Sequence, residues 1–173
     1  VHKAFDEATA VLAGDSLHAL AFEVLADEAT HEDPFVRSEL VLELARASGP
    51  SGMAGGQMME LTAEHETFDL NTTTRLQQLK TGALISFCLD AGAIMGRVGD
   101  AQRTKLRGYA HDLGLAFQIA DNLLDVEGSS AKTGKAVQKD AAAGKATFVS
   151  LLGIERARTQ AEMLIDQAIG HLH

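Results

Sequence analysis

The sequence predicts an all-α fold, a helical bundle, and three observations support this. Apolar residues recur at steps of three and four between Leu113 and Leu124, which is the spacing of one face of a helix. Aromatic residues make up 5% of the 173 residues and only two prolines occur, which favours long, closely packed helices. No stretch alternates apolar and polar residues as a half-buried strand would. We therefore expect a single helical domain over residues 1–173.

Composition and charge restrict the function. Hydrophobic residues make up 46% of the chain and charged residues 23%, which is typical of a globular protein. The net charge of −9 argues against a nucleic-acid partner, which needs a basic face. The single cysteine, Cys88, excludes an internal disulfide and favours a reducing, cytoplasmic location. No unbroken run of 18 or more apolar residues and no signal peptide is found, so we expect no transmembrane segment.

The first half of the chain predicts two helices and a glycine-rich segment. Residues 4–28 carry an apolar stripe at helical spacing. Asp33 as cap and Pro34 as first helical residue begin a second helix, which runs to Ala47. Three glycines in segment 51–60 would each cost a helix about 1 kcal/mol relative to alanine. A glycine loop is therefore slightly favoured there, since a helix would require another backbone or a ligand close by.

The second half predicts a polar loop and three helices. The loop covers residues 62–71, and Asn71 or Thr72 caps the helix that follows it. Asp100 caps the next helix, and a lysine-rich loop precedes the last one. The three helices are expected over residues 72–95, 101–127 and 147–172.

An acidic pair is the first candidate for a functional site. Asp121 and Asp125 are four residues apart, so on a helix they share one face at roughly 6 Å. Gln118 lies on nearly the same face, and Gly128 ends the helix. Such pairs are commonly just solvated, but here apolar residues surround the pair. Mg²⁺ prefers one or two carboxylates plus phosphate oxygens, and four lysines follow that suit a polyphosphate: Lys132, Lys135, Lys139 and Lys145.

The segment from Phe117 to Asp125, F-Q-I-A-D-N-L-L-D, resembles the second aspartate-rich motif of the trans-isoprenyl diphosphate synthases, F-Q-x-x-D-D-x-x-D. Asn122 departs from that pattern, which usually has a second aspartate. Thr133-Gly134-Lys135 resembles the T-G-K of this family, and Gly144-Lys145-Ala146-Thr147 its G-K-x-T. Lys80-Thr81-Gly82 resembles its K-T-G, although alone it would be taken for a surface lysine beside a threonine.

Three further segments extend the resemblance over essentially the whole chain. Gly55 to Glu60 resembles G-G-Q-x-x-D, with glutamate in place of the more frequent aspartate. Ala13 to Leu17 resembles A-G-D-A-L, and Val1-His2-Lys3 resembles the stretch just after the first aspartate-rich motif of the family. We therefore expect the middle and later part of a synthase without that first motif, and expect these 173 residues alone to be inactive.

The resemblance implies an isoprenoid synthase helical bundle, here partial, and an enzyme that is a cytoplasmic homodimer. The implied reaction joins isopentenyl diphosphate to an allylic diphosphate, giving geranyl, farnesyl or geranylgeranyl diphosphate, with Mg²⁺ or alternatively Mn²⁺. Product length does not follow from the sequence. The resemblance implies metal binding by Asp121 and Asp125, catalysis by Lys80, Thr81, Gln118 and Lys135, diphosphate binding by Lys80, Gln118, Lys135 and Lys145, and secondary roles for Gln57, Glu60 and Asp140.

Other functions remain open from the residues alone. A family-like chain could pair with an active subunit without binding metal, and Asn122 is consistent with that alternative. A plain helical interaction module would make five ordered motifs accidental, and terpene cyclases lack the pairing of K-T-G with T-G-K. The histidines show no spacing typical of zinc sites. Cys88 lies on an apolar helix face and is expected in the core rather than as a nucleophile.

Overall fold

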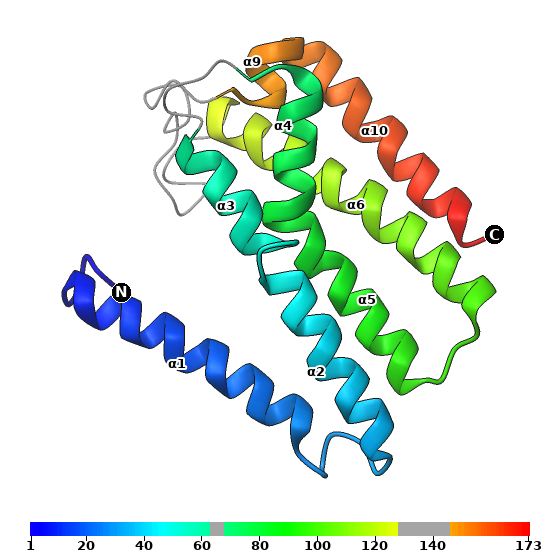
Figure 1. The fold of residues 1–173 in the computed structure, drawn as a ribbon. Helices are drawn as coiled ribbons and strands as arrows, with labels where there is room; N and C mark the ends of the chain where they lie inside the picture. The colour runs from blue at the N-terminus through cyan, green and yellow to red at the C-terminus, as the bar shows by residue number, and fades with distance from the viewer. Residues whose placement is uncertain (63–67, 128–145) are drawn as a thin grey trace. The chain divides into compact units, whose positions relative to one another are not determined.

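A computed structural model describes residues 1–62, 68–127 and 146–173 (Figure 1). Every regular element in these ranges is a helix and none is a strand, which confirms the all-α prediction. The chain divides into two compact units, Val1–Ala45 and Arg46–His173. The candidate site residues from Gln57 onward all belong to the second unit.

Both helices of the first unit begin at an aspartate, as their sequences require. Helix α1 spans Glu7–Ala26, and the carboxylate of Asp6 accepts the backbone N–H of Thr9 at 2.8 Å. Helix α2 spans Pro34–Ser48, and the Asp33 carboxylate accepts the N–H of Phe35 at 2.9 Å. Each aspartate satisfies a donor that the first turn of a helix leaves unpaired. The two predicted helices and the Asp33 cap are confirmed.

Helix α1 keeps its apolar side chains in contact with solvent. None of its residues is buried. By length and composition it is also apolar enough to cross a membrane, although polar residues such as Asp15 and His18 interrupt its apolar run. The exposed apolar residues include Val11, Leu12, Leu17, Leu20 and Val24.

The glycine-rich segment of the second unit is helical, so the slightly favoured loop is wrong. Helix α3 spans Met53–Thr62. A methyl group placed on Gly56 would lie 2.3 Å from the backbone nitrogen of Lys80. Only a residue without a side chain allows so close an approach of two backbones. The glycine is therefore used for packing between helices, the alternative reason that the sequence offered.

Residues 70–95 form three helical elements in direct succession. Helix α4 spans Leu70–Gln77, a π-helical turn labelled η2 spans Gln78–Gly82, and α5 spans Ala83–Met95. The predicted helix over 72–95 is confirmed, but the π turn was not foreseen. The residue that caps α4 is neither Asn71 nor Thr72. The Asp69 carboxylate accepts the N–H of Thr72 at 2.8 Å, so the helix begins earlier than predicted.

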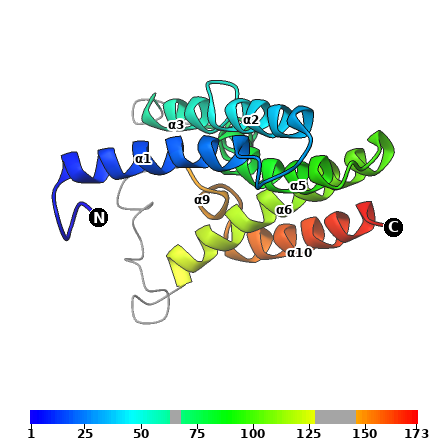
Figure 2. The ribbon, with the colours of Figure 1, turned by 90° about the horizontal axis from the view of Figure 1, so that it is seen from below.

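Helix α6 spans Asp100–Glu127 and lies between α5 and the last helix, α10, in both views (Figures 1 and 2). Asp100 is in its first turn rather than at the cap, which still places a carboxylate near the positive end of the helix dipole. The single helix predicted over 147–172 is two helices, α9 over Phe148–Leu152 and α10 over Ile154–His171. Gly153 separates them with a φ of 82°, a conformation that glycine adopts without strain.

A buried hydrophobic cluster joins α6, α9 and α10. On α6, Ala116, Ile119 and Leu123 face this cluster, whereas Phe117 and Leu124 remain 54% and 53% exposed. The predicted stripe of Leu113, Ala116, Phe117, Ala120 and Leu124 is thus only partly the buried face, because Ala116 is in the cluster but Phe117, Ala120 and Leu124 are exposed. The remaining members are Phe148, Val149, Ala157, Ala161 and Leu164. The alanines among the members are small and let the three helices approach closely.

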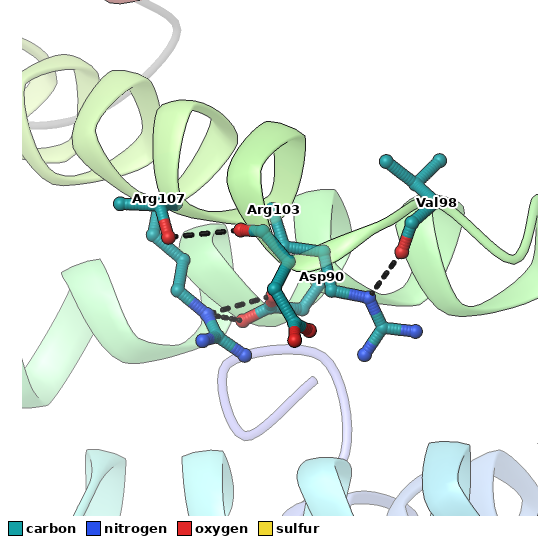
Figure 3. A network of polar contacts seen from close by, with 6 residues as sticks. Asp90, Val98, Arg103 and Arg107 are labelled. Atoms are coloured by element: carbon teal, nitrogen blue, oxygen red, sulfur yellow. Dashed lines mark hydrogen bonds and ion pairs between the residues drawn. The ribbon is translucent and has the colours of Figure 1, made fainter.

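An ion pair ties the later part of α5 to the first half of α6. The guanidinium Nε of Arg107 donates to the two carboxylate oxygens of Asp90 at 3.0 and 3.2 Å (Figure 3). Nearby, Nε of Arg103 donates to the carbonyl of Val98 at 3.0 Å in the connecting turn. The ion pair thus joins α5 and α6 on the solvent side of the bundle.

Candidate active site

A cavity of about 540 Å³ is walled by η2, α5 and α6. Lys80 and Thr81 give it a polar part, contributed by the π turn. The rest of the wall is apolar apart from a thiol. An ammonium and a hydroxyl beside an apolar hollow suit an amphipathic ligand with an anionic head. The other lining residues are Leu84, Ile85, Cys88, Leu113 and Phe117.

The carboxylate pair continues the α6 wall of this cavity. Leu113 and Phe117 line the cavity, and Asp121 and Asp125 follow at further steps of four residues on the same helix. Each such step advances about 6 Å and turns about 40°. Asp125 is 6% exposed and Asp121 is partly buried. The helix therefore runs from an apolar wall directly into two shielded carboxylates.

The donor set at this pair fits Mg²⁺ in combination with a phosphorylated ligand. Among the described residues no group of three or more His, Cys, Asp or Glu side chains could enclose a metal by itself. Mg²⁺ commonly binds through one or two carboxylates and completes its shell with water and phosphate oxygens. Asp121 and Asp125 supply that number of carboxylates.

Asn122 has a structural contact that explains the departure from the aspartate-rich pattern. Its side chain is 5% exposed, and its Oδ1 accepts the backbone N–H of Phe148 at 3.3 Å. Adjacent helical residues point about 100° apart, so Asn122 does not share the face of the two aspartates. The amide satisfies a donor at the start of α9 that would otherwise be unpaired.

Lys80 is held by helix α3 as well as by its own turn. Its Nζ forms an ion pair with Glu60, and Nε2 of Gln57 donates to the same carboxylate oxygen at 3.3 Å. On the other side of the turn, a methyl on Gly114 of α6 would lie 3.3 Å from the Cα of Gly82. The π turn is thus packed between two glycine-containing helices.

The structure brings some of the predicted site residues together and leaves others untested. Lys80 and Thr81 share the cavity, and Gln57 and Glu60 join them through Lys80. Gln118 is partly buried on α6, next to the cavity residue Phe117. The remaining predicted residues lie outside the described part of the chain and stay predictions: Lys135, Asp140 and Lys145, with the other lysines of that loop.

Sequence reasoning missed the apolar wall. Leu84, Ile85 and Cys88 follow Lys80 and Thr81 at steps of three and four, and that spacing was the available signal. Cys88 was expected in the core, but it is exposed and lines the cavity. The helix face that carries it borders the hollow, whereas Ala93 and Ile94 of the same helix are buried.

Comparison with known proteins identifies relatives of this chain. The family model described as polyprenyl synthetase matches residues 1–172. The farnesyl diphosphate synthase of Escherichia coli (strain K12) is 44% identical over 172 residues, which is 96% of this chain and 56% of that protein. The putative geranylgeranyl pyrophosphate synthase 8 of Arabidopsis thaliana is 41% identical, over 96% of this chain and 47% of its own length.

Two solved structures share the fold. An FPP/GFPP synthase from Zymomonas mobilis has a TM-score of 0.86 and 60% identity, over 99% of this chain and 57% of its own. A geranyltransferase from Helicobacter pylori, complexed with magnesium and isoprenyl diphosphate, has a TM-score of 0.89 and 32% identity, over 99% and 55%. The chain thus spans about half the length of the relatives it matches.

Proposed function

This chain belongs to the polyprenyl synthetase family. We propose that it functions in a short-chain prenyltransferase, an enzyme that joins isopentenyl diphosphate to an allylic diphosphate. The observation that carries the proposal is the order of side chains along α6. Leu113 and Phe117 line an apolar cavity, and Asp121 and Asp125 follow them at steps of four residues. A ligand with an apolar tail and a metal-bound anionic head matches that order.

The proposed ligand is an allylic diphosphate. Its tail lies along Leu84, Ile85 and Phe117, where burial of apolar surface favours binding by about 25 cal/mol per Å². Its diphosphate lies toward Lys80 and the carboxylate pair. Lys135 and Lys145 are proposed to add positive charge from the loop outside the described residues, and Gln118 to contact the diphosphate. The proposal covers short-chain products as a class and not one length.

The reaction requires charge stabilisation more than acid–base groups. The allylic C–O bond breaks, and the electron pair leaves with the diphosphate. The double bond of isopentenyl diphosphate then forms the new C–C bond, and the resulting cation loses a proton to the released diphosphate. Lys80 offsets charge that builds on the leaving group. Thr81 faces the allylic cation, and the apolar wall excludes water that would capture it.

Mg²⁺ bound by Asp121 and Asp125 would supply Lewis-acid polarisation of the diphosphate oxygens. The carboxylate donor set and the magnesium complex of the H. pylori relative support this ion. The support does not extend to Mn²⁺. Asp140, outside the described residues, stays a secondary candidate, whereas Glu60 pairs with Lys80 and Gln57 donates to Glu60.

We also propose a homodimer located in the cytoplasm. The single cysteine supports the location, because it gives no disulfide framework of the kind that secreted domains use. The dimer comes from the family resemblance alone. Light scattering coupled to size-exclusion chromatography measures the mass directly, and a monomer at micromolar concentration would contradict the proposed dimer.

Binding of an unreactive substrate analogue tests the proposed function. Isothermal titration calorimetry with geranyl thiodiphosphate is expected to give tight binding in Mg²⁺ and weak binding in EDTA. Inorganic diphosphate is expected to bind more weakly than the analogue, because it lacks the tail. Equal affinity with and without Mg²⁺ would contradict the metal-bound head, and equal affinity of the two ligands would contradict the tail cavity.

A further inference from the structure

Helix α3 contacts both ends of Lys80. At the side-chain end, Nζ of Lys80 pairs with Oε2 of Glu60, in the last turn of α3, while 30% of the lysine side chain and 16% of the glutamate remain exposed. At the backbone end, a methyl on Gly56 would lie 2.3 Å from the Lys80 nitrogen. Gly56 and Glu60 are one turn apart, so a single face of α3 makes both contacts.

The carboxylate of Glu60 is itself oriented. Nε2 of Gln57 donates to the same Oε2 that Lys80 contacts, at 3.3 Å. Gln57 precedes Glu60 by three residues on the same helix, which is the spacing of neighbouring side chains. The position of the Lys80 ammonium is therefore set by α3, an element that does not line the cavity.

A lysine without such a partner is a poorly defined anion ligand. Its four-carbon stem has high rotamer entropy, and that entropy is lost when the ammonium is fixed against a ligand. An ammonium has three N–H donors. One donor directed to Glu60 leaves two for the oxygens of a diphosphate at the cavity.

We propose that Glu60 is a positioning residue, which holds the ammonium of Lys80 at the cavity so that it is ready for the diphosphate of the substrate. This inference rests on the proposed function and deepens it. Glu60 acts through Lys80 and makes no contact with the substrate. A carboxylate beside a diphosphate is repelled unless a cation lies between them, so the order Glu60, Lys80, diphosphate is the favourable one.

The test is a double-mutant cycle read by calorimetry with inorganic diphosphate and Mg²⁺. Glu60→Gln keeps the shape of the side chain and removes its charge. It is expected to weaken binding roughly 5- to 20-fold, and to have no further effect once Lys80 is replaced in Lys80→Met. Glu60→Asp, which keeps the charge, is expected to recover part of the affinity, and it replaces Glu60→Gln should that variant not fold.

Asp90→Asn is the matched control. Asp90 is a carboxylate of similar exposure, 13%, paired with Arg107 away from Lys80. It is expected to leave diphosphate affinity unchanged. A second readout needs no ligand: acylation of Lys80 by an amine-reactive ester, followed by mass spectrometry, should be faster in Glu60→Gln and unchanged in Asp90→Asn.

The outcomes separate the two proposals. Tighter binding by Glu60→Gln would mean that Glu60 competes with the ligand, and equal weakening in the Lys80→Met background would mean a general structural effect; either would overturn the positioning role. If the wild type binds diphosphate and Glu60→Gln binds it with the same affinity, the positioning role alone is overturned. A wild type that binds no diphosphate would overturn the proposed function and this inference with it.

Discussion

The side-chain carbonyl of Asn122 accepts the backbone N–H of Phe148 across 26 residues of sequence, at 3.3 Å. The contact joins the helix that carries the acidic pair to the first residue of α9. In the sequence, Asn122 precedes Lys135 and Lys145, and Phe148 follows them. A position that departs from the aspartate-rich pattern is therefore a connection between two helices.

Removing this amide should destabilise the fold. Asn122→Ala leaves the buried N–H of Phe148 without its acceptor, which typically costs about 1–3 kcal/mol. Asn122→Asp keeps an acceptor oxygen and serves as the control. Urea denaturation followed by circular dichroism gives both free energies of unfolding. Equal unfolding free energies for wild type and Asn122→Ala would show that the hydrogen bond contributes nothing.

The two aspartates should control metal-dependent binding, whereas Asn122 should not. Asp121→Ala removes one of the two carboxylates proposed for Mg²⁺, and its affinity for geranyl thiodiphosphate in Mg²⁺ is expected to fall to the level seen in EDTA. Asn122→Asp is expected to change that affinity little, because position 122 faces α9. A large gain in affinity from Asn122→Asp would favour the non-catalytic alternative, in which the asparagine is the defect.

An added methyl at Gly56 should disturb the site through the backbone of Lys80. Gly56→Ala overfills the contact between α3 and η2, which typically costs about 1–3 kcal/mol, and diphosphate binding should weaken with it. Gly92→Ala is the control, since no atom beyond the surrounding backbone of its own helix lies within 4 Å of a methyl there. In a helix it should stabilise by about 0.5–1 kcal/mol. Thermal unfolding distinguishes the two, and equal shifts would contradict the close approach at Gly56.

Cys88 should report occupation of the cavity. It is the only cysteine of the chain and lines the apolar wall, so a maleimide labels one known position. Geranyl thiodiphosphate is expected to slow the labelling, whereas inorganic diphosphate, which has no tail, is not. Mass spectrometry measures both rates. Equal protection by the two ligands would show that the tail does not reach Cys88.

The cap at the start of α4 should lose its contribution in acid. The hydroxyl and then the N–H of Thr72 hydrogen-bond the carboxylate of Asp69 and lower its pKa below the ordinary 3.8. Because folding lowers the pKa of Asp69, the ionised carboxylate stabilises the fold at pH values above its pKa in the unfolded chain. This stabilisation is lost as the pH falls through the lowered pKa of the folded state. At about pH 6 the wild type should have a higher melting temperature than Asp69→Ser, and below pH 3.8 the difference should be smaller. A pH-independent difference would contradict this.

The sequence predicted those features that depend on local chemistry. The cap at Asp33, the end of α2 to within one residue of the predicted Ala47, and the acidic pair on α6 follow from residue type and spacing. The helical state of Gly55 and Gly56 did not follow, because its reason is a partner backbone 24 residues further along the chain, at Lys80. The buried face of α6 was misread because apolar residues face both the core and the cavity, and periodicity alone does not separate the two.

The site geometry depended most on tertiary contacts. Lys80 and Glu60 were both selected by motif, but their pairing follows only from how α3 packs on η2. The π turn likewise has no sequence signature, since Gln78, Leu79 and Lys80 are ordinary helix formers and a single threonine and glycine after them occur in α-helices too. Cys88 was assigned to the core because an apolar helix face usually meets another helix, and here it meets a hollow.

The π turn also sets the register of the cavity wall. Each residue of an α-helix turns the chain by about 100°, and a π turn accommodates one residue more than an α turn. Deleting a single residue between Gln78 and Gly82 would therefore allow an unbroken α-helix that keeps Leu84, Ile85 and Cys88 at the cavity, because the π turn absorbs the extra residue within one turn. Making the segment α-helical without a deletion would instead rotate those three side chains by about 100° relative to α4. The meeting of this wall with Leu113 and Phe117 therefore depends on the π conformation of the segment.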